Sequence, residues 1–346
     1  MNKNLIPVFF SVDDNYVPFL IVTLESIVSN ASKDNFYNFY VLNNGISKEN
    51  IEKVMKYNKN NFKIEFVNMA DKLVKIGDAL HTRDYYSKTT YYRLFIPTMF
   101  PQFDKALYLD CDIAVQADIA ELYNTNLGNN LVGAIADESV GIIPEFINYV
   151  NNFLGVKNTN YFNAGILLMN LKELRKIDFE GKFINLISSY TFNVAQDQDY
   201  LNVICKDRVT YASKVWNKMP FEDNSLALKD IKLIHYNLSF KPWHYTDVLY
   251  QEVFWKYAKQ AGQEEKMLQL LAEFTDEKKQ KDALGGKKLI EMADAQSKQK
   301  DSFKSLLESG EINSVTFLRR DALAPDQVLA NFVEKIGSKF AKKNNK

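Results

Sequence analysis

The alternation of apolar segments with helical patterns in the first 67 residues constrains the fold most. The segments Leu5–Val12, Asn38–Leu42 and Phe62–Val67 are rich in β-branched and aromatic residues, as buried strands are. Val17–Val28 has apolar residues at helical spacing, and a polar helix is expected from residue 50 to 58. Strand–helix–strand alternation predicts an α/β fold, with parallel strands covered by helices on both faces.

Further elements are expected along the rest of the chain. Short apolar runs at 106–109, 131–135 and 165–171 continue the strand pattern. A helix is expected over Leu174–Tyr190, and Gln198–Val203 is typical of the start of another helix. From about residue 247 the composition becomes helical and rich in Lys, Glu, Gln and Ala. We therefore expect one domain over residues 1–250 and a helical C-terminal extension over 251–346. Within 275–288, Gly285-Gly286 predicts a solvated linker or a helix break.

The overall charge excludes a general attraction to nucleic acid. Lys plus Arg and Asp plus Glu both number 43, so no net field favours a polyanion. The two cysteines, Cys111 and Cys205, lie far apart in no metal-binding spacing, which fits a reducing compartment. No signal peptide or membrane-spanning run is recognisable. These observations predict a soluble cytoplasmic protein.

Carboxylates at the ends of two predicted strands point to a binding site. Asp110-Cys111-Asp112 follows the buried run 106–109, and Asp13-Asp14 follows the first strand. Burying an unpaired charge is costly, so a cation, hydrogen-bond donors or open water must compensate. In an extended segment, residues i and i+2 point the same way, so Asp110 and Asp112 can face one cation. Ligands of such sheets bind at the carboxyl ends of the strands.

A third metal ligand would make the Asp-x-Asp pattern more specific. Of the three histidines, His235 follows the apolar run "IKLI", again at a strand end. Two carboxylates and an imidazole suit Mn²⁺, with Mg²⁺ as the alternative. Lys241 follows six residues later and could reach a phosphate as a point charge. The alternative for His235 is a hydrogen-bonded core histidine.

A second Asp-x-Asp, Asp197-Gln198-Asp199, shows that the pattern alone does not identify a metal site. It precedes the helix-like segment "YLNVIC". Carboxylates are favourable at a helix N-terminus without any ligand. Helix capping therefore remains an equal alternative for this pair.

Six segments in sequence order resemble glycosyltransferase family 8, the retaining group that includes bacterial lipopolysaccharide galactosyl- and glucosyltransferases and glycogenin. They are "FFSVDDNYVPFL", "TTYYRLFIP", "KALYLDCDI", "YFNAGILLMNL", "AQDQDYLN" and "HYNLSFKPWH". The resemblance covers residues 5–245. It implies a GT-A fold, a Rossmann-like mixed sheet flanked by helices that binds a UDP-sugar through Mn²⁺.

The resemblance also implies roles for individual residues. Asp110, Asp112 and His235 would be the metal ligands, and Lys241 would contact the diphosphate. Gln198 and Asp197 would act at the reacting sugar, with Gln198 beside the anomeric carbon on the face opposite the leaving UDP. The remaining donor-binding positions would be Ser11, Val12, Asp13, Asn15, Tyr16, Arg93, Cys111, Asn163, Ala164 and Gly165. Leu238 departs from the family's usual small residue three positions after the metal histidine.

The resemblance predicts a retaining hexosyltransferase that moves galactose or glucose from a UDP-sugar to a saccharide acceptor of the bacterial surface. The transition state would be oxocarbenium-like, as in glycoside cleavage. A non-catalytic nucleotide-sugar-binding scaffold and a self-glucosylating primer are the alternatives. No G-x-x-x-x-G-K or G-x-G-x-x-G sequence is present, which disfavours a phosphate-loop enzyme.

The C-terminal tail has a pattern of its own. Val328, Leu329, Phe332, Val333, Ile336 and Phe340 fall on one helical stripe, and residues 335–346 hold five lysines and no acid. This pattern predicts either peripheral contact with the inner face of the cell membrane or a stripe that packs on the main domain.

Overall fold

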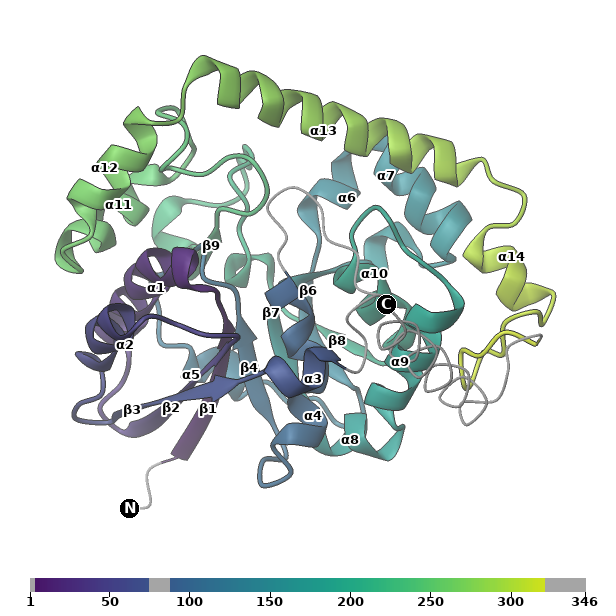
Figure 1. Ribbon diagram of the computed structural model, residues 1–346, viewed down its shortest axis with the longest axis horizontal. Coiled ribbons are helices and arrows are strands. Elements are labelled where there is room, and N and C mark those ends of the chain that lie inside the picture. Colours follow the sequence, from purple (N-terminus) through teal and green to yellow (C-terminus); the bar gives the residue numbers. More distant parts are fainter. Residues whose placement is uncertain (1–3, 75–87, 321–346) are drawn as a thin grey trace, which may run out of the picture.

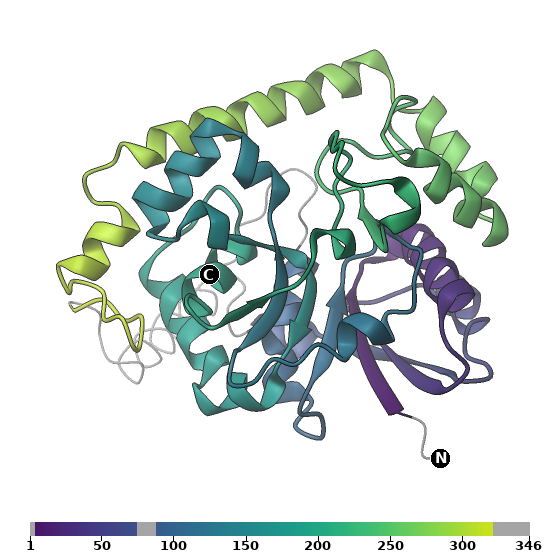
Figure 2. The same ribbon diagram turned by 180° about the vertical axis from the view of Figure 1, so that it is seen from behind.

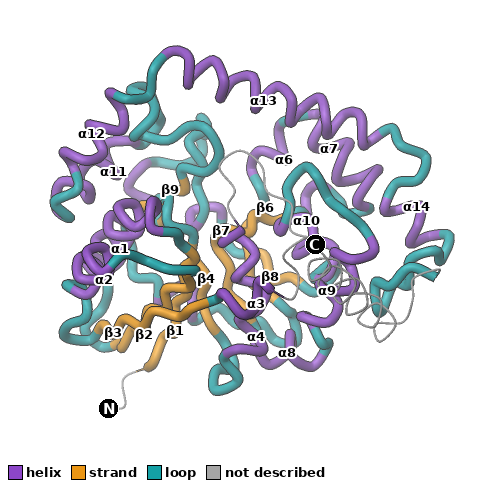
Figure 3. Tube along the Cα trace, in the orientation of Figure 1, coloured by secondary structure: helices purple, strands orange, loops and turns teal. Residues whose placement is uncertain are grey.

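A mixed seven-stranded sheet forms the centre of the molecule in the computed structural model, which describes residues 4–74 and 88–320 (Figures 1 and 3). Among these residues the strand order is β3-β2-β1-β4-β7-β6-β8, and a small antiparallel pair, β5-β9, lies beside the sheet. The strands are β1 (Asn4–Ser11), β2 (Asn35–Asn43), β3 (Phe62–Asn68), β4 (Ala106–Leu109), β5 (Ile113–Val115), β6 (Val132–Ala136), β7 (Phe162–Met169), β8 (Val209–Tyr211) and β9 (Leu233–His235).

Most strands of the sheet share one direction. β1 pairs in parallel with β2 and with β4, and β2 pairs in parallel with β3. β7 is antiparallel to both of its neighbours, β4 and β6, so β6 again runs the same way as β4. The carboxyl ends of β1, β4 and β6 therefore meet at one edge of the sheet.

Helices cover both faces of the sheet, as Figures 1 and 2 show from opposite sides. In β4 the side chains alternate, with Leu107 and Leu109 in one buried cluster and Ala106 and Tyr108 in another. Burial on both faces explains why the strands are continuous apolar runs. The helices are α1 (Val17–Asn30), α2 (Lys48–Met55), α3 (Ala70–Val74), α4 (Ile96–Met99), α5 (Ala120–Tyr123), α6 (Glu138–Ile142), α7 (Pro144–Asn148), α8 (Leu171–Lys176), α9 (Phe179–Ser189), α10 (Asp197–Ile204), α11 (Gln251–Gln260), α12 (Glu264–Ala272), α13 (Asp276–Ser297) and α14 (Phe303–Glu308).

The fold class and most element positions predicted from the sequence are confirmed, but two helix predictions are wrong. The expected single helix over 174–190 is broken between α8 and α9. Asp178 lies at the break in the left-handed conformation (φ 52°), and its carboxylate accepts a hydrogen bond from the Gly181 N–H at the start of α9. The expected break at Gly285-Gly286 is absent, because α13 continues through both glycines while it packs against α7.

The C-terminal helices pack on two sides of the sheet-bearing part. α11 lies against α1, whereas α13 runs along the outer edge from α12 to α14 and lies against α7 and the π-helical turn Tyr149–Leu154 (Figures 1 and 2). The domain division near residue 250 stays a prediction. No helix within residues 4–74 and 88–320 is long and apolar enough to cross a membrane. The predicted tail stripe at 328–340 lies outside the described residues.

Candidate active site

A cavity opens at the edge where the carboxyl ends of β1 and β4 meet. Of the residues assigned to donor, metal or catalysis from the sequence, only Asn15 is not among those that line it, and its side chain is exposed. The lining residues from that set are Ser11, Val12, Asp13, Tyr16, Arg93, Asp110, Cys111, Asp112, Asn163, Ala164, Gly165, Asp197, Gln198, His235 and Lys241. The fold thus gathers six separate stretches of the chain into one site.

Backbone pairing places the three predicted metal ligands close together. Asp110 directly follows β4, and its N–H donates to the Gly165 carbonyl at 2.7 Å. Asp112 immediately precedes β5, and His235 ends β9, which pairs with β5 in a register that sets His235 opposite Ile113. The Thr23 hydroxyl of α1 donates to the Cys111 carbonyl at 2.8 Å and holds the intervening turn.

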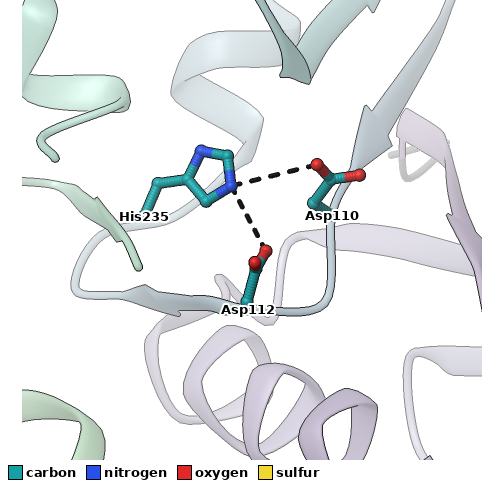
Figure 4. A group of neighbouring side chains, drawn as sticks. All are labelled: Asp110, Asp112 and His235. Carbon is teal, nitrogen blue, oxygen red and sulfur yellow. Dashed lines mark ion pairs between the residues drawn. The ribbon is translucent and has the colours of Figure 1, made fainter. Parts of the chain in front are cut away.

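The ligand atoms of Asp110, Asp112 and His235 converge within 4.8 Å of one another (Figure 4). His235 Nε2 lies 3.2 Å from Asp112 Oδ1 and 3.9 Å from Asp110 Oδ2. Its other ring nitrogen, Nδ1, lies 2.9 Å from the amide oxygen of buried Asn217. An oxygen only accepts, so Nδ1 carries a proton, and Nε2 is the ring nitrogen that faces the carboxylates. This donor set and tautomer fit a divalent cation such as Mn²⁺ or Mg²⁺.

Both carboxylates also have a positively charged neighbour. Lys241 Nζ lies 2.6 Å from Asp112 Oδ2 and donates to the Tyr236 carbonyl, and an Arg93 nitrogen lies 3.3 Å from Asp110 Oδ1. Burial by itself would raise the pKa of Asp112, but Lys241 and His235 hold that pKa well below its usual range. Burial and the flanking carboxylates raise the pKa of the Cys111 thiol, which favours its neutral form.

Arg93 connects the Asp110–Asp112–His235 end of the cavity with α10. Its guanidinium is buried, lies over the Tyr108 ring at 4.3 Å, and contacts Asp197 Oδ2 at 3.0 Å through Nε. It also donates to the Ala164 carbonyl and to the Thr90 carbonyl and hydroxyl. Burial raises the pKa of Asp197 to about 6, although Arg93 and the Thr90 hydroxyl oppose the rise. Asp197 is thus part of a buried ion pair and not the capping residue of α10, which is Gln196.

Three further hydrogen bonds fix the Gln198 side chain. Its Oε1 accepts from the Ala164 N–H at 3.0 Å and from Asn163 Nδ2 at 3.3 Å. Its Nε2 donates to Asp137 Oδ2 at 3.0 Å, and the same carboxylate oxygen accepts from Asn163 at 3.2 Å. Asn163, Gln198 and Asp137 thus form one rigid polar wall.

Gly165 lies within β7 and allows this strand to approach the side chains of Asp110 and His235 closely. A Cβ atom built on Gly165 would lie 2.5 Å from the His235 ring and 2.6 Å from Asp110 Oδ2. Real Cβ atoms essentially never make contacts under 3.0 Å. Only glycine therefore fits at this position without moving two of the three ligands.

Sequence reasoning missed Asp137, Asn217 and the Tyr108 hydroxyl, which donates to Asp110 at 3.0 Å. Asp137 follows β6, whose carboxyl end lies at the same edge as that of β4, so the strand-end rule applied to Asp110 would have found it. Asn217 comes from a loop before β9, and nothing in its local sequence connects it with His235.

Comparisons with known proteins agree with this geometry. The model of glycosyl transferase family 8 matches residues 7–247. A putative glycosyltransferase of Haemophilus influenzae is 30% identical over 247 residues, with 68% of this chain and 72% of that protein covered. The lipopolysaccharide 1,2-glucosyltransferase of Escherichia coli is 26% identical over 253 residues, with 68% and 73% covered.

Solved structures show the same architecture. The galactosyltransferase LgtC, in complex with donor and acceptor sugar analogues, is 30% identical with a TM-score of 0.59, and 74% of this chain and 96% of that one are covered. The bifunctional glycosyltransferase WbbM is 28% identical with a TM-score of 0.65, and 78% of this chain matches about half of it, 52%. Fold and site define a GT-A glycosyltransferase that uses a sugar-nucleotide donor and a saccharide acceptor. The chain belongs to glycosyl transferase family 8.

Proposed function

We propose that this glycosyltransferase is a retaining hexosyltransferase that moves galactose or glucose from a UDP-sugar to a saccharide of the bacterial surface, with Mn²⁺ bound by Asp110, Asp112 and His235. The observation that carries the proposal is the convergence of these three ligands, with Lys241 2.6 Å from one of them, at one end of the cavity. A non-catalytic scaffold would not need this set of charged groups to be kept together.

In the proposed reaction the bond between the anomeric carbon and the diphosphate breaks, and its electron pair stays on the diphosphate. The acceptor oxygen forms the new bond to that carbon, and its proton passes to the departing diphosphate oxygen on the same face. A cation held by Asp110, Asp112 and His235 would supply Lewis-acid stabilisation of the departing diphosphate. Lys241 provides a second positive charge at the same end, where electrostatic stabilisation of the leaving group is most effective.

The fixed position of Gln198 bears on how the configuration would be retained. Its amide makes three hydrogen bonds and carries no charge, so it is a poor nucleophile. We therefore favour attack of the acceptor on the same face as the leaving group over a covalent intermediate on Gln198.

The proposed place of action is the cytoplasm, and flotation with anionic vesicles would test contact of the tail at 328–346 with the membrane.

The test is hydrolysis of a panel of UDP-sugars with and without Mn²⁺ by the wild type and by Asp112→Asn. Asp104→Asn is the matched control, because the Asp104 side chain is 77% exposed on the surface. We expect slow, metal-dependent release of UDP from UDP-galactose or UDP-glucose, retained in the control and lost in Asp112→Asn. UDP binding that needs no metal would refute the metal assignment.

Two alternatives are outcomes of the same test. Binding of UDP without turnover in the presence of any acceptor would favour the scaffold. A mass increase of the intact protein by hexose units after incubation with UDP-glucose would favour the self-glucosylating primer.

A further inference from the structure

A second cavity adjoins the one described above. The two share four lining residues, Asn163, Gln198, Asn237 and Leu238. A group bound in the second cavity would therefore meet a donor sugar at the Gln198 wall. This is the position that an acceptor must take, since its hydroxyl has to reach the anomeric carbon.

The wall away from the donor is apolar. It includes Val140 of α6, Phe146 of α7 and Val150 of the π-helical turn. Leu289 of α13 completes it, and this residue lies 42 positions beyond the end of the segment that matches the family, residue 247. The C-terminal extension thus contributes to the site a side chain that the matched family segment does not contain.

Several contacts fix α13 in this place. Its middle packs on α7 and on the π-helical turn, and Leu289 packs against the same hydrophobic cluster as Phe146. Near its N-terminal end, Asp282 accepts hydrogen bonds from the Tyr245 hydroxyl at 2.6 Å and from the Ser239 hydroxyl at 3.0 Å. Ser239 follows Leu238 directly, so α13 both supplies Leu289 to the second cavity and contacts the loop that supplies Leu238.

The chemistry of the two walls selects the kind of occupant. One wall offers the amides of Asn163 and Gln198 and the Asp137 carboxylate to hydroxyl groups, and the other offers an aromatic ring and aliphatic side chains. A hexopyranoside ring has hydroxyls at its edge and an apolar C–H face. These polar groups already hydrogen-bond to one another, and Gln198 Nε2 uses one of its two N–H groups on Asp137, so the other can donate to a ring hydroxyl.

We propose that the second cavity binds the hexopyranoside ring that carries the attacking hydroxyl, and that Leu289 of α13 is a specificity-determining residue for this acceptor. The inference rests on the proposed function, since it needs a donor in the adjoining cavity. Leu289 packs against the C–H face of the ring, and Asp282 keeps α13 and the Leu238 loop at the spacing that the ring requires.

The experiment measures transfer and hydrolysis side by side. A panel of phenyl β-hexopyranosides serves as acceptor, and the readout is the ratio of glycoside formed to UDP-sugar hydrolysed. Leu289→Trp, which narrows the cavity, is expected to lower this ratio at least tenfold, and Leu289→Ala about threefold with a raised acceptor KM. Leu284→Ala is the matched control on the same helix, since Leu284 is 51% exposed and lines neither cavity.

The outcomes separate this inference from the function on which it rests. Absence of metal-dependent hydrolysis in the wild type would contradict the proposed function. Hydrolysis without transfer to any hexopyranoside of the panel would overturn the assignment of the cavity to such a ring. An unchanged transfer ratio and acceptor KM in both Leu289 variants would overturn the role of α13. The use of two substitutions of opposite size guards against a fold defect in one of them.

Discussion

Substitution of Gly165 by alanine tests the metal-binding cluster without removing any of its ligands. The added Cβ would lie 2.5 Å from His235 Cε1 and 2.6 Å from Asp110 Oδ2, so each must move by about 0.4–0.5 Å to reach even 3.0 Å. Coordination distances tolerate only about 0.2 Å of deviation. Gly165 has no positive φ, so alanine strains the site through space alone.

The expected result is a selective loss of metal binding. Overpacking at one position costs about 1–3 kcal/mol of folding stability, which a domain of this size tolerates. Displacement of two ligands should weaken Mn²⁺ binding by at least the tenfold to hundredfold that loss of an outer-shell partner costs. Isothermal titration with Mn²⁺ measures the affinity, and denaturant unfolding without metal measures the stability.

Gly141→Ala provides the matched control. Gly141 lies in α6, and a Cβ there meets nothing within 4 Å. Replacing a helical glycine by alanine should leave metal affinity unchanged and stabilise the fold by about 0.4–1 kcal/mol. The reasoning is refuted if Gly165→Ala binds Mn²⁺ within threefold of the wild type.

Three further substitutions test single features of the site. Asn217→Ala removes the acceptor of the His235 Nδ1 proton and should weaken Mn²⁺ binding about tenfold to hundredfold in the same titration. An unchanged affinity would show that Asn217 does not orient the His235 ring. In Arg93→Lys a single ammonium group cannot pair with both Asp110 and Asp197. Unfolding in urea should therefore show that the free energy of unfolding falls by an amount on the order of 3 kcal/mol. A fall of less than about 1 kcal/mol would contradict the ion-pair assignment. Burial raises the pKa of Asp199 from 3.8 to about 6, so the folded state binds the proton more tightly than the unfolded state. Between pH 4 and pH 7 the free energy of unfolding of the wild type should therefore fall by an amount on the order of 3 kcal/mol, and that of Asp199→Asn should not show this fall. Parallel plots of unfolding free energy against pH for the two proteins would disprove this.

The elements of the sheet could be predicted because their physical cause is local. Strands buried on both faces are unbroken apolar runs, so the segments at 106–109 and 62–67 coincide with β4 and β3 to within a residue. The same pattern made the acidic ends of β1 and β4 conspicuous. The backbone then brings Asp110, Asp112 and His235 together as the pattern indicated.

Features that depend on tertiary contacts could not be predicted in this way. Two adjacent glycines weaken a helix by about 1 kcal/mol each, yet α13 continues through them because it packs on α7 more than a hundred residues earlier in the chain. The break at Asp178 depends on one residue in a left-handed conformation, which the helical spacing on either side conceals. Leu289 reaches the second cavity for the same long-range reason.

The charge balance of the site bears on how a protein without net charge would bind the proposed diphosphate donor. Lys241 pairs with Asp112, whereas Arg93 is shared by Asp110 and Asp197, so the three carboxylates outnumber the two cations by one. A divalent cation among the carboxylates would make the net charge of this end positive. Asp112 would then have the cation as its counter-charge, and Lys241 could contact the donor. The attraction for the proposed diphosphate donor would then depend on the cation more than on the fixed charges, and binding of the metal and of the donor would favour each other reciprocally. The totals of 43 basic and 43 acidic residues do not reveal such local coupling.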